Sequence, residues 1–285
     1  MVDEILNEKD TRTGYNKEEY IKKKKEQLNN AYKTIDEGLE EIKSNPDFFM
    51  SYLDIQGRFD LYTPRNAILI AKQLPSAIQL KEMKKWIDDK AIFKNKYPNK
   101  VIILDPREPY TTKDGKMVRG YTAKELVDIS ETNIKPYIKN YDKKMILQAL
   151  LHECPMDIKS VNALEDDKTS KWDTDNKVIY LCKNEDSNLA FKNALIELSK
   201  INIYDNTKEI DNEKAKCVAF MLCKKYGLDI EFNDVSKITD RFKNMDKQDV
   251  INELTSMKES VRELNKQISD YIEVNIKTKN KEQER

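Results

Sequence analysis

Apolar residues spaced three and four apart predict a mainly helical chain. Toward the N-terminus this spacing continues to about Ser44, and Asn16 with Glu19 resembles a capping box; its apolar members are Ile21, Leu28, Tyr32, Ile35, Leu39 and Ile42. The lysines at 22–25 fit a solvated face of that helix. The most regular spacing lies near the C-terminus, at Leu254, Met257, Val261, Leu264, Ile268 and Tyr271. It predicts the seam of a long helix that packs either on its own domain or on a second copy.

Prolines, glycines and short apolar runs predict the remaining elements of the first half. Pro46 opens a second helix that Gly57 ends, and Thr63 with Pro64 gives the N-cap and first position of a helix that stops before Pro75. A further helix carries Trp86. Residues 101–104 form a buried-strand run, and residues 110–121 suit a hairpin around an Asp-Gly turn.

Pro136 and its polar neighbours mark the best candidate linker. Beyond it the pattern predicts a helix over about 141–152, a strand at 178–181, and helices near 186–203 and 209–226. With 285 residues the chain is long enough for two domains, and 36% charged residues with only six glycines favour helix over sheet. No apolar run approaches the roughly 20 residues that cross a bilayer, and the N-terminus lacks a signal-peptide pattern. A cytoplasmic protein without a membrane partner is expected.

Charge and cysteine usage narrow the possible chemistry. The net charge is zero, but residues 51–150 hold 19 Lys and Arg against 12 Asp and Glu. Such a basic middle suits a polyanion, although inert surfaces also carry excesses of this size. The four cysteines form no C-x-x-C pair, which argues against a zinc ribbon or a redox motif.

Residues 195–200 have the frame of the zinc-peptidase motif H-E-x-x-H without its histidines. Glu197 is kept, whereas Ile196 and Lys200 occupy the two histidine positions, and His152 is the only histidine in the chain. In the intact motif both histidines bind one zinc ion and the glutamate activates its water. Isoleucine has no donor and an ammonium repels a cation. The segment is therefore either an ordinary amphipathic stretch or a decayed zinc helix, and neither a metal nor another cofactor is predicted.

Residues 48 to about 132 resemble the N-terminal domain of the ArdC-like (LtrC-like) antirestriction proteins of plasmids and conjugative elements. The matching motifs, in order, are Arg58-Phe59, Tyr62-Thr63-Pro64-Arg65-Asn66, Gln73-Leu74-Pro75-Ser76-Ala77, Trp86, Ile102-Ile103-Leu104-Asp105-Pro106 and Val127-Asp128-Ile129-Ser130-Glu131-Thr132. The resemblance implies a domain that binds single-stranded DNA, which proteins hold with cations and stacking aromatic rings. The candidate ligands are Arg58, Tyr62, Arg65, Asn66, Lys72, Lys84, Lys85 and Trp86. Alternatively, Phe59, Ile70 and Trp86 are core residues, which leaves the cations and Tyr62 at the surface.

The second half resembles the family's zincin-like metallopeptidase domain. An aspartate-turned strand at 172–181 precedes the motif helix, and the segment 213–220 resembles the E-x-x-A-E-x-x-A-Y segment that brings an acidic third ligand. Glu213 is retained, but Lys216 replaces the second glutamate. The resemblance thus implies a pseudo-metallopeptidase. From the two lysines, Lys200 and Lys216, we expect an ammonium to occupy the old metal region and to pair with Glu197 or Glu213.

The expected fold class is α+β, with a small mixed α/β DNA-binding domain before a helix-rich zincin-like domain closed by a long C-terminal helix. The expected divisions are an N-terminal helical arm (1–45), the DNA-binding domain (46–135), the zincin-like domain (140–275) and a disordered tail (276–285). Two alternatives to DNA binding remain. One is a non-enzymatic protein-interaction module, with a partner or second copy on the C-terminal helix, and the other is a rewired hydrolase using Glu197, His152 and Cys154.

Overall fold

The computed structural model describes residues 17–112, 114–136, 141–154, 156–165, 168–183, 186–229, 231 and 236–283. The elements of the first half are α2 (Lys17–Ser44), α3 (Pro46–Arg58), α4 (Pro64–Gln73), β1 (Leu80–Lys81), α5 (Met83–Asp88), β2 (Val101–Pro106), β3 (Tyr110–Thr111), β4 (Met117–Val118), β5 (Tyr121–Asp128) and the 3-10 turn η1 (Ile129–Glu131). Those of the second half are α6 (Lys143–Glu153), β6 (Asp157–Val161), β7 (Ser170–Asp173), β8 (Val178–Cys182), α7 (Ser187–Thr207), α8 (Asn212–Lys225), α9 (Ser236–Phe242) and α10 (Lys247–Gln283). The predicted α+β class is confirmed.

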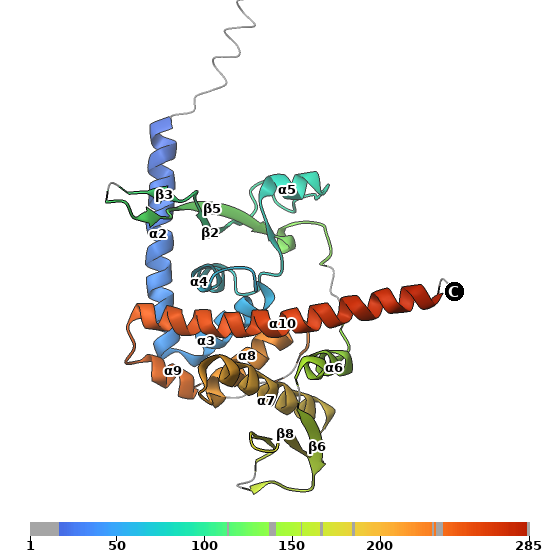
Figure 1. Ribbon diagram of the computed structural model, residues 1–285. Coiled ribbons are helices and arrows are strands. Elements are labelled where there is room, and N and C mark those ends of the chain that lie inside the picture. Colours follow the sequence, from blue (N-terminus) through green and yellow to red (C-terminus); the bar gives the residue numbers. More distant parts are fainter. Residues whose placement is uncertain are drawn as a thin grey trace, which may run out of the picture.

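Two small sheets lie at opposite ends of a helical body (Figure 1). In the first, β5 pairs antiparallel with β1 on one side and β2 on the other. In the second, β8 pairs parallel with β6 and antiparallel with β7. The short ribbon of β3 and β4 is the predicted hairpin, and its Gly115 takes the left-handed φ of +77° that the tight turn requires. The edge strands are β1 and β2 in the first sheet and β6 and β7 in the second.

Local capping chemistry explains where several helices begin. The Thr63 hydroxyl accepts a hydrogen bond from the Asn66 amide at 3.3 Å, as the sequence predicts for the start of α4. The Asn45 side chain accepts from the amides of Asp47 and Phe48 at the start of α3. In both cases proline follows the cap, where its missing N–H costs nothing.

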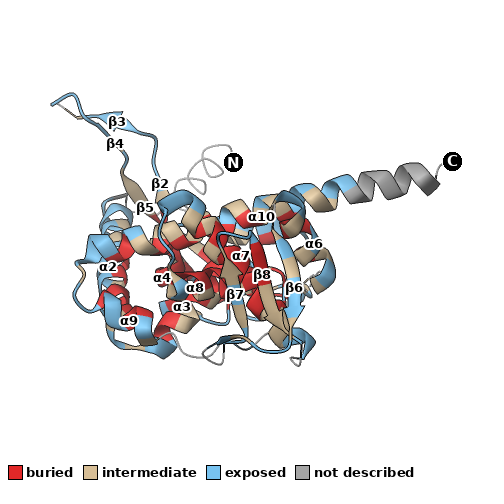
Figure 2. Cartoon of the chain, turned by 60° about the horizontal axis from the view of Figure 1, so that its bottom comes forward, coloured by how far each residue is buried: buried red, intermediate tan, exposed pale blue. Residues whose placement is uncertain are grey.

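One hydrophobic core runs through both halves of the chain. It joins buried residues from α2, α3, α4, β2 and β5 to those of α6, α7, α8, α9 and α10. Figure 2 shows this buried material as a continuous band across the body. Of the predicted C-terminal seam, all residues from Leu254 to Ile268 are at most 3% exposed within this core. The seam therefore packs on its own chain, which is the first of the two arrangements predicted from the sequence.

Other expectations need correction. Ile21 and Tyr32 are 55% and 41% exposed, and the buried face of α2 begins only at Ala31. Along its length α2 packs on α4, β5 and α9. The backbone of α10 is helical to Gln283, where a tail from residue 276 is predicted to be disordered. Helix α9 and strand β6 are not predicted from the sequence. Asn16 and the middle of the predicted linker lie outside the described residues.

Gly57 does not end α3, because the helix continues to Arg58. Its role is close packing: a Cβ at this position would lie 2.6 Å from the Met221 carbonyl oxygen and 3.0 Å from Cβ of Lys224, both on α8. The glycine lets the backbones of α3 and α8 approach, which joins the two halves of the chain.

We expect Gly57→Ala to lower the free energy of unfolding by about 1–3 kcal/mol, because overpacking against a backbone outweighs the gain of about 1 kcal/mol in helix propensity. Urea unfolding measures this loss. Gly120→Ala is the matched control, since its Cβ would come no nearer than 3.8 Å to Arg107 Cδ. Equal stability of the two variants would contradict the packing role.

Among the described residues, no helix combines the length and the apolar character that a membrane crossing requires.

Candidate functional site

Helix α7 carries the motif positions and lies between a sheet and another helix. Asp186 caps its N-terminus by accepting hydrogen bonds from the amides of Asn188 and Leu189. One side of α7 contacts β7 and β8, and another side packs along α8. Nine of its side chains are buried, Glu197 among them. The predicted order is present, with a strand segment that turns at an aspartate before this helix. Between β7 and β8, the Asp173 side chain accepts hydrogen bonds from the amides of Asp175 and Asn176.

Glu197 is a fully buried carboxylate held by one ammonium and one hydroxyl. Its Oε1 accepts from the Lys200 ammonium at 2.8 Å and from the Ser170 hydroxyl on β7 at 2.7 Å. Its Oε2 has no hydrogen-bond partner among the described residues. Lys200 lies one turn along α7, and its side chain is 16% exposed. The predicted pairing of Lys200 with Glu197 is confirmed.

Lys216 on α8 forms the second predicted pair, but in a wetter setting. Its ammonium lies 3.0 and 3.1 Å from the two carboxylate oxygens of Glu213, and the side chains are 37% and 22% exposed. Both lysines therefore pair with a glutamate three residues before them on the same helix. The more exposed pair, Lys216 with Glu213, contributes less to stability than the buried pair of Lys200 with Glu197, because water screens its charges.

The motif positions do not fit a divalent metal. Ile196 offers no donor, the Lys200 ammonium occupies Oε1 of Glu197, and Lys216 adds a second cation. No group of three or more His, Cys, Asp or Glu side chains among the described residues is arranged to hold an ion. Catalytic zinc needs three protein ligands and an open position. The chemistry available at α7 is therefore charge neutralisation of a buried carboxylate.

The proposed hydrolase trio of Glu197, His152 and Cys154 does not share contacts. His152 is exposed, lies 3.2 Å from the Glu153 carboxylate, and packs its ring against Tyr271. Burial raises the pKa of the Cys154 thiol, which disfavours the thiolate nucleophile. The contacts of Glu197 are with Ser170 and Lys200 instead.

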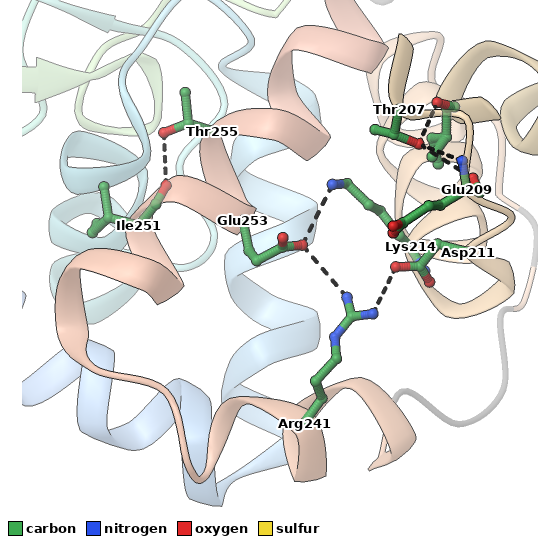
Figure 3. Close-up of polar contacts among 9 residues, drawn as sticks. Thr207, Glu209, Asp211, Lys214, Arg241, Ile251, Glu253 and Thr255 are labelled. Atoms are coloured by element: carbon green, nitrogen blue, oxygen red, sulfur yellow. Dashed lines mark hydrogen bonds and ion pairs between the residues drawn. The ribbon is translucent and has the colours of Figure 1, made fainter. Parts of the chain in front are cut away.

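A charge network missed by sequence reasoning fixes the start of α8 (Figure 3). Lys214 is 5% exposed, and its ammonium lies 3.4 Å from the Glu253 carboxylate on α10. Arg241 on α9 bridges Glu253 and Asp211, at 3.5 and 2.6 Å. Asp211 also caps α8 by accepting from the Lys214 amide. The network holds three helices together around the segment that carries Lys216.

Three of the eight predicted DNA ligands serve the fold. Trp86 is 1% exposed and donates its indole N–H to the Val127 carbonyl at 2.8 Å. Asn66 is 6% exposed and exchanges two hydrogen bonds with the backbone of Leu104, at 2.8 and 2.9 Å. Arg58 donates to the carbonyls of Pro75 and Ala77. Because the polar atoms of Trp86 and Asn66 are buried and already bonded, the structure gives these two residues no exposed polar group for a DNA contact.

The other predicted ligands are more accessible but do not form a cluster of unpaired cations. Lys72 lies 2.7 Å from Glu41, and the ammonium of Lys85 is 3.9 Å from Glu82. Arg65 reaches the Gln248 side chain at 3.5 Å, and Lys84 is exposed on α5. Tyr62 is half-buried against Phe59, and this burial raises the pKa of its hydroxyl. These five stay candidates.

Comparison with solved structures, rather than with sequences, shows which known protein shares this α+β fold. No protein-family model matches the sequence, and no curated protein matches it. Among solved structures, the metal-free crystal structure of the antirestriction protein ArdC from the R388 plasmid aligns over 73% of this chain and 86% of its own, with a TM-score of 0.50 and 11% identity. The Mn(II)-bound structure of ArdC aligns over 84% of this chain and 97% of its own, with a TM-score of 0.55 and 11% identity. The chain therefore has an ArdC-like fold.

Proposed function

We propose that the chain is an ArdC-like protein of a mobile genetic element, which binds single-stranded DNA in antirestriction or conjugation and has no peptidase activity. The observation that carries the proposal is the extent of the shared fold, which reaches 97% of the ArdC chain in its Mn(II)-bound form. The family motifs in residues 48–132 add the expectation of DNA binding. The neighbouring structure is that of an antirestriction protein, which supplies the biological setting.

The contacts of Glu197 support the proposed absence of peptidase activity. A metallopeptidase glutamate takes a proton from a metal-bound water. Here the same position is buried, and its Oε1 is bonded to Lys200 and Ser170. With an isoleucine and two lysines at the ligand positions, the chain keeps the zincin-like helix as a scaffold whose charge is balanced internally.

A gel-shift titration with labelled single-stranded DNA tests the proposed binding. Phosphate contacts release counterions, so affinity should fall with salt at about −0.7 in log–log slope per contact on a single strand. With four contacts, a fourfold rise in salt lowers affinity about 50-fold. No shift at low salt would defeat the proposal. Equal affinity at low salt and at the fourfold higher salt concentration would show that the protein does not bind the phosphates.

One cavity favours the alternative of a protein-interaction module. A space of about 490 Å³ lies beside α7, where the indole N–H of Trp172 and Oδ1 of Asn202 have no hydrogen-bond partner among the described residues. Three acids, Glu153, Asp175 and Asp205, lie at the same cavity against one lysine, Lys177, and this acidic excess suits a basic segment of a partner. Leu264→Asp would not test this alternative, because Leu264 is 3% exposed and a buried aspartate there would unfold the core. Sedimentation is the better measurement: a mass above 33.5 kDa without any DNA shift favours this alternative.

A further inference from the structure

A groove separates the N-terminal part of α2 from strand β5. Its volume is about 760 Å³; Tyr20, Ile21 and Lys25 of α2 form one wall, and residues 122–125 of β5 form the other. Arg107, just after β2, closes one side. Lys24 spans the groove, because its ammonium contacts the Ala123 carbonyl at 3.3 Å. The run of lysines at 22–25 is thus more than a solvated face of the helix.

The carboxylates in this groove are all neutralised by lysines. Glu125 is bonded by Lys100 and Gln27 and lies 3.7 Å from Lys24; these contacts lower the pKa of Glu125 to about 2. Lys124 lies 3.0 Å from Glu82 and 3.4 Å from Asp105. Because every acid is paired, the acids repel a polyanion only weakly.

Two cations of the groove are left for a ligand. Lys25 and Arg107 are exposed, and neither forms an ion pair among the described residues. The hairpin that follows Arg107 continues the basic surface with Lys116 and Arg119, both exposed. Figure 2 shows this ribbon standing away from the body of the molecule. The accessible cations therefore run from α2 across β5 and out along the hairpin.

Exposed aromatic and apolar side chains accompany these cations. Tyr20 is 46% exposed on α2, Tyr110 is 58% exposed on β3, and Met117 is 77% exposed on β4. An exposed ring beside phosphate-binding cations is the combination that holds single-stranded nucleic acids, since bases stack on rings while the backbone contacts the cations.

We propose that single-stranded DNA lies in the groove between α2 and β5 and continues along the β3–β4 hairpin. Lys25 and Arg107 contact phosphates, and Tyr20 and Tyr110 stack with bases. This inference rests on the proposed DNA-binding function but moves the site away from α4 and α5. It assigns the contacts to residues outside the motifs that suggested DNA binding.

Gel shifts of five full-length proteins test the site: the wild type, Lys25→Ala/Arg107→Ala, Tyr110→Ala, Lys84→Ala/Lys85→Ala and Lys171→Ala/Lys183→Ala. The groove double variant should lose two phosphate contacts, with affinity at low salt falling at least 10-fold and the log–log salt slope shrinking by about 1.4. Tyr110→Ala should lower affinity by about 5-fold or more through lost stacking. The last pair removes two exposed lysines near β7 and β8 and controls for net charge; it should bind like the wild type.

The possible outcomes separate the groove from the proposed DNA-binding function. If the wild type binds and only Lys84→Ala/Lys85→Ala weakens it, the groove is overturned while the function stands. If all three double variants weaken binding equally, only net charge matters and the groove is again overturned. If the wild type does not bind, both proposals fail. Thermal unfolding of each protein checks that the substituted chains remain folded. We expect them to, because all seven substituted side chains are exposed.

Discussion

Lys200→Met should lower the free energy of unfolding by about 3–5 kcal/mol, because it leaves the carboxylate of Glu197 buried without a countercharge. Glu197 is fully buried, Oε2 has no partner among the described residues, and Lys200 supplies the one ammonium bonded to Oε1. Methionine keeps most of the side-chain length, so the loss reports on charge rather than on a cavity. Urea unfolding measures it.

Two further variants separate charge compensation from other effects. Adding Glu197→Gln to Lys200→Met removes both charges and should recover most of the lost stability. Lys216→Met is the matched control on α8, where the pair with Glu213 is more exposed and its loss should cost less than about 1 kcal/mol. Equal losses of stability for Lys200→Met and Lys216→Met would contradict the prediction that burial makes the charge of Glu197 costly to leave unpaired.

Trp86→Ala should cost about 3–5 kcal/mol and leave the DNA affinity of the folded protein unchanged. The indole is 1% exposed and packs with Val127 and Ile129, and Lys81 covers its ring with an ammonium 4.6 Å from the ring centre. The residue therefore anchors α5 against β5 and offers no face to a base. Urea unfolding and a gel shift under folding conditions measure the two quantities.

Trp86→Phe is the conservative variant for this position. It keeps an aromatic ring but removes the hydrogen bond to the Val127 carbonyl, so about 1–3 kcal/mol should be lost. A stable Trp86→Ala protein with strongly weakened DNA binding would instead restore Trp86 as a ligand.

The features predicted from the sequence are those that depend on near neighbours in the chain. The N-cap at Thr63, the turn at Gly115 and the pairing of Lys200 with Glu197 each involve residues within four positions. Helical geometry alone brings residues three apart together, so the last contact follows once α7 is recognised as a helix.

Features that depend on distant segments were not predicted or were assigned the wrong role. Asn66 looks like a free polar side chain until Leu104, 38 residues later, is placed beside it. Gly57 looks like a helix stop until the backbone of α8 is seen against it. Arg107 and Lys25 belong to one groove only because β5 packs on α2. Composition signalled a basic middle of the chain, but not which of its cations are already paired.

The contact between α3 and α8 can form only late in synthesis, because α3 is made well before α8. Asp60 and Lys225, which are 165 residues apart, form an ion pair of 2.7 Å beside it. At a translation rate of about 5–20 residues per second, the apolar face of α3 waits roughly 8–33 s for α8 to be made. During that interval the nascent chain exposes Gly57 and its buried neighbours to solvent. The buried face of α3 is therefore completed only after α8 has been made, because residues of the second half supply its packing partners.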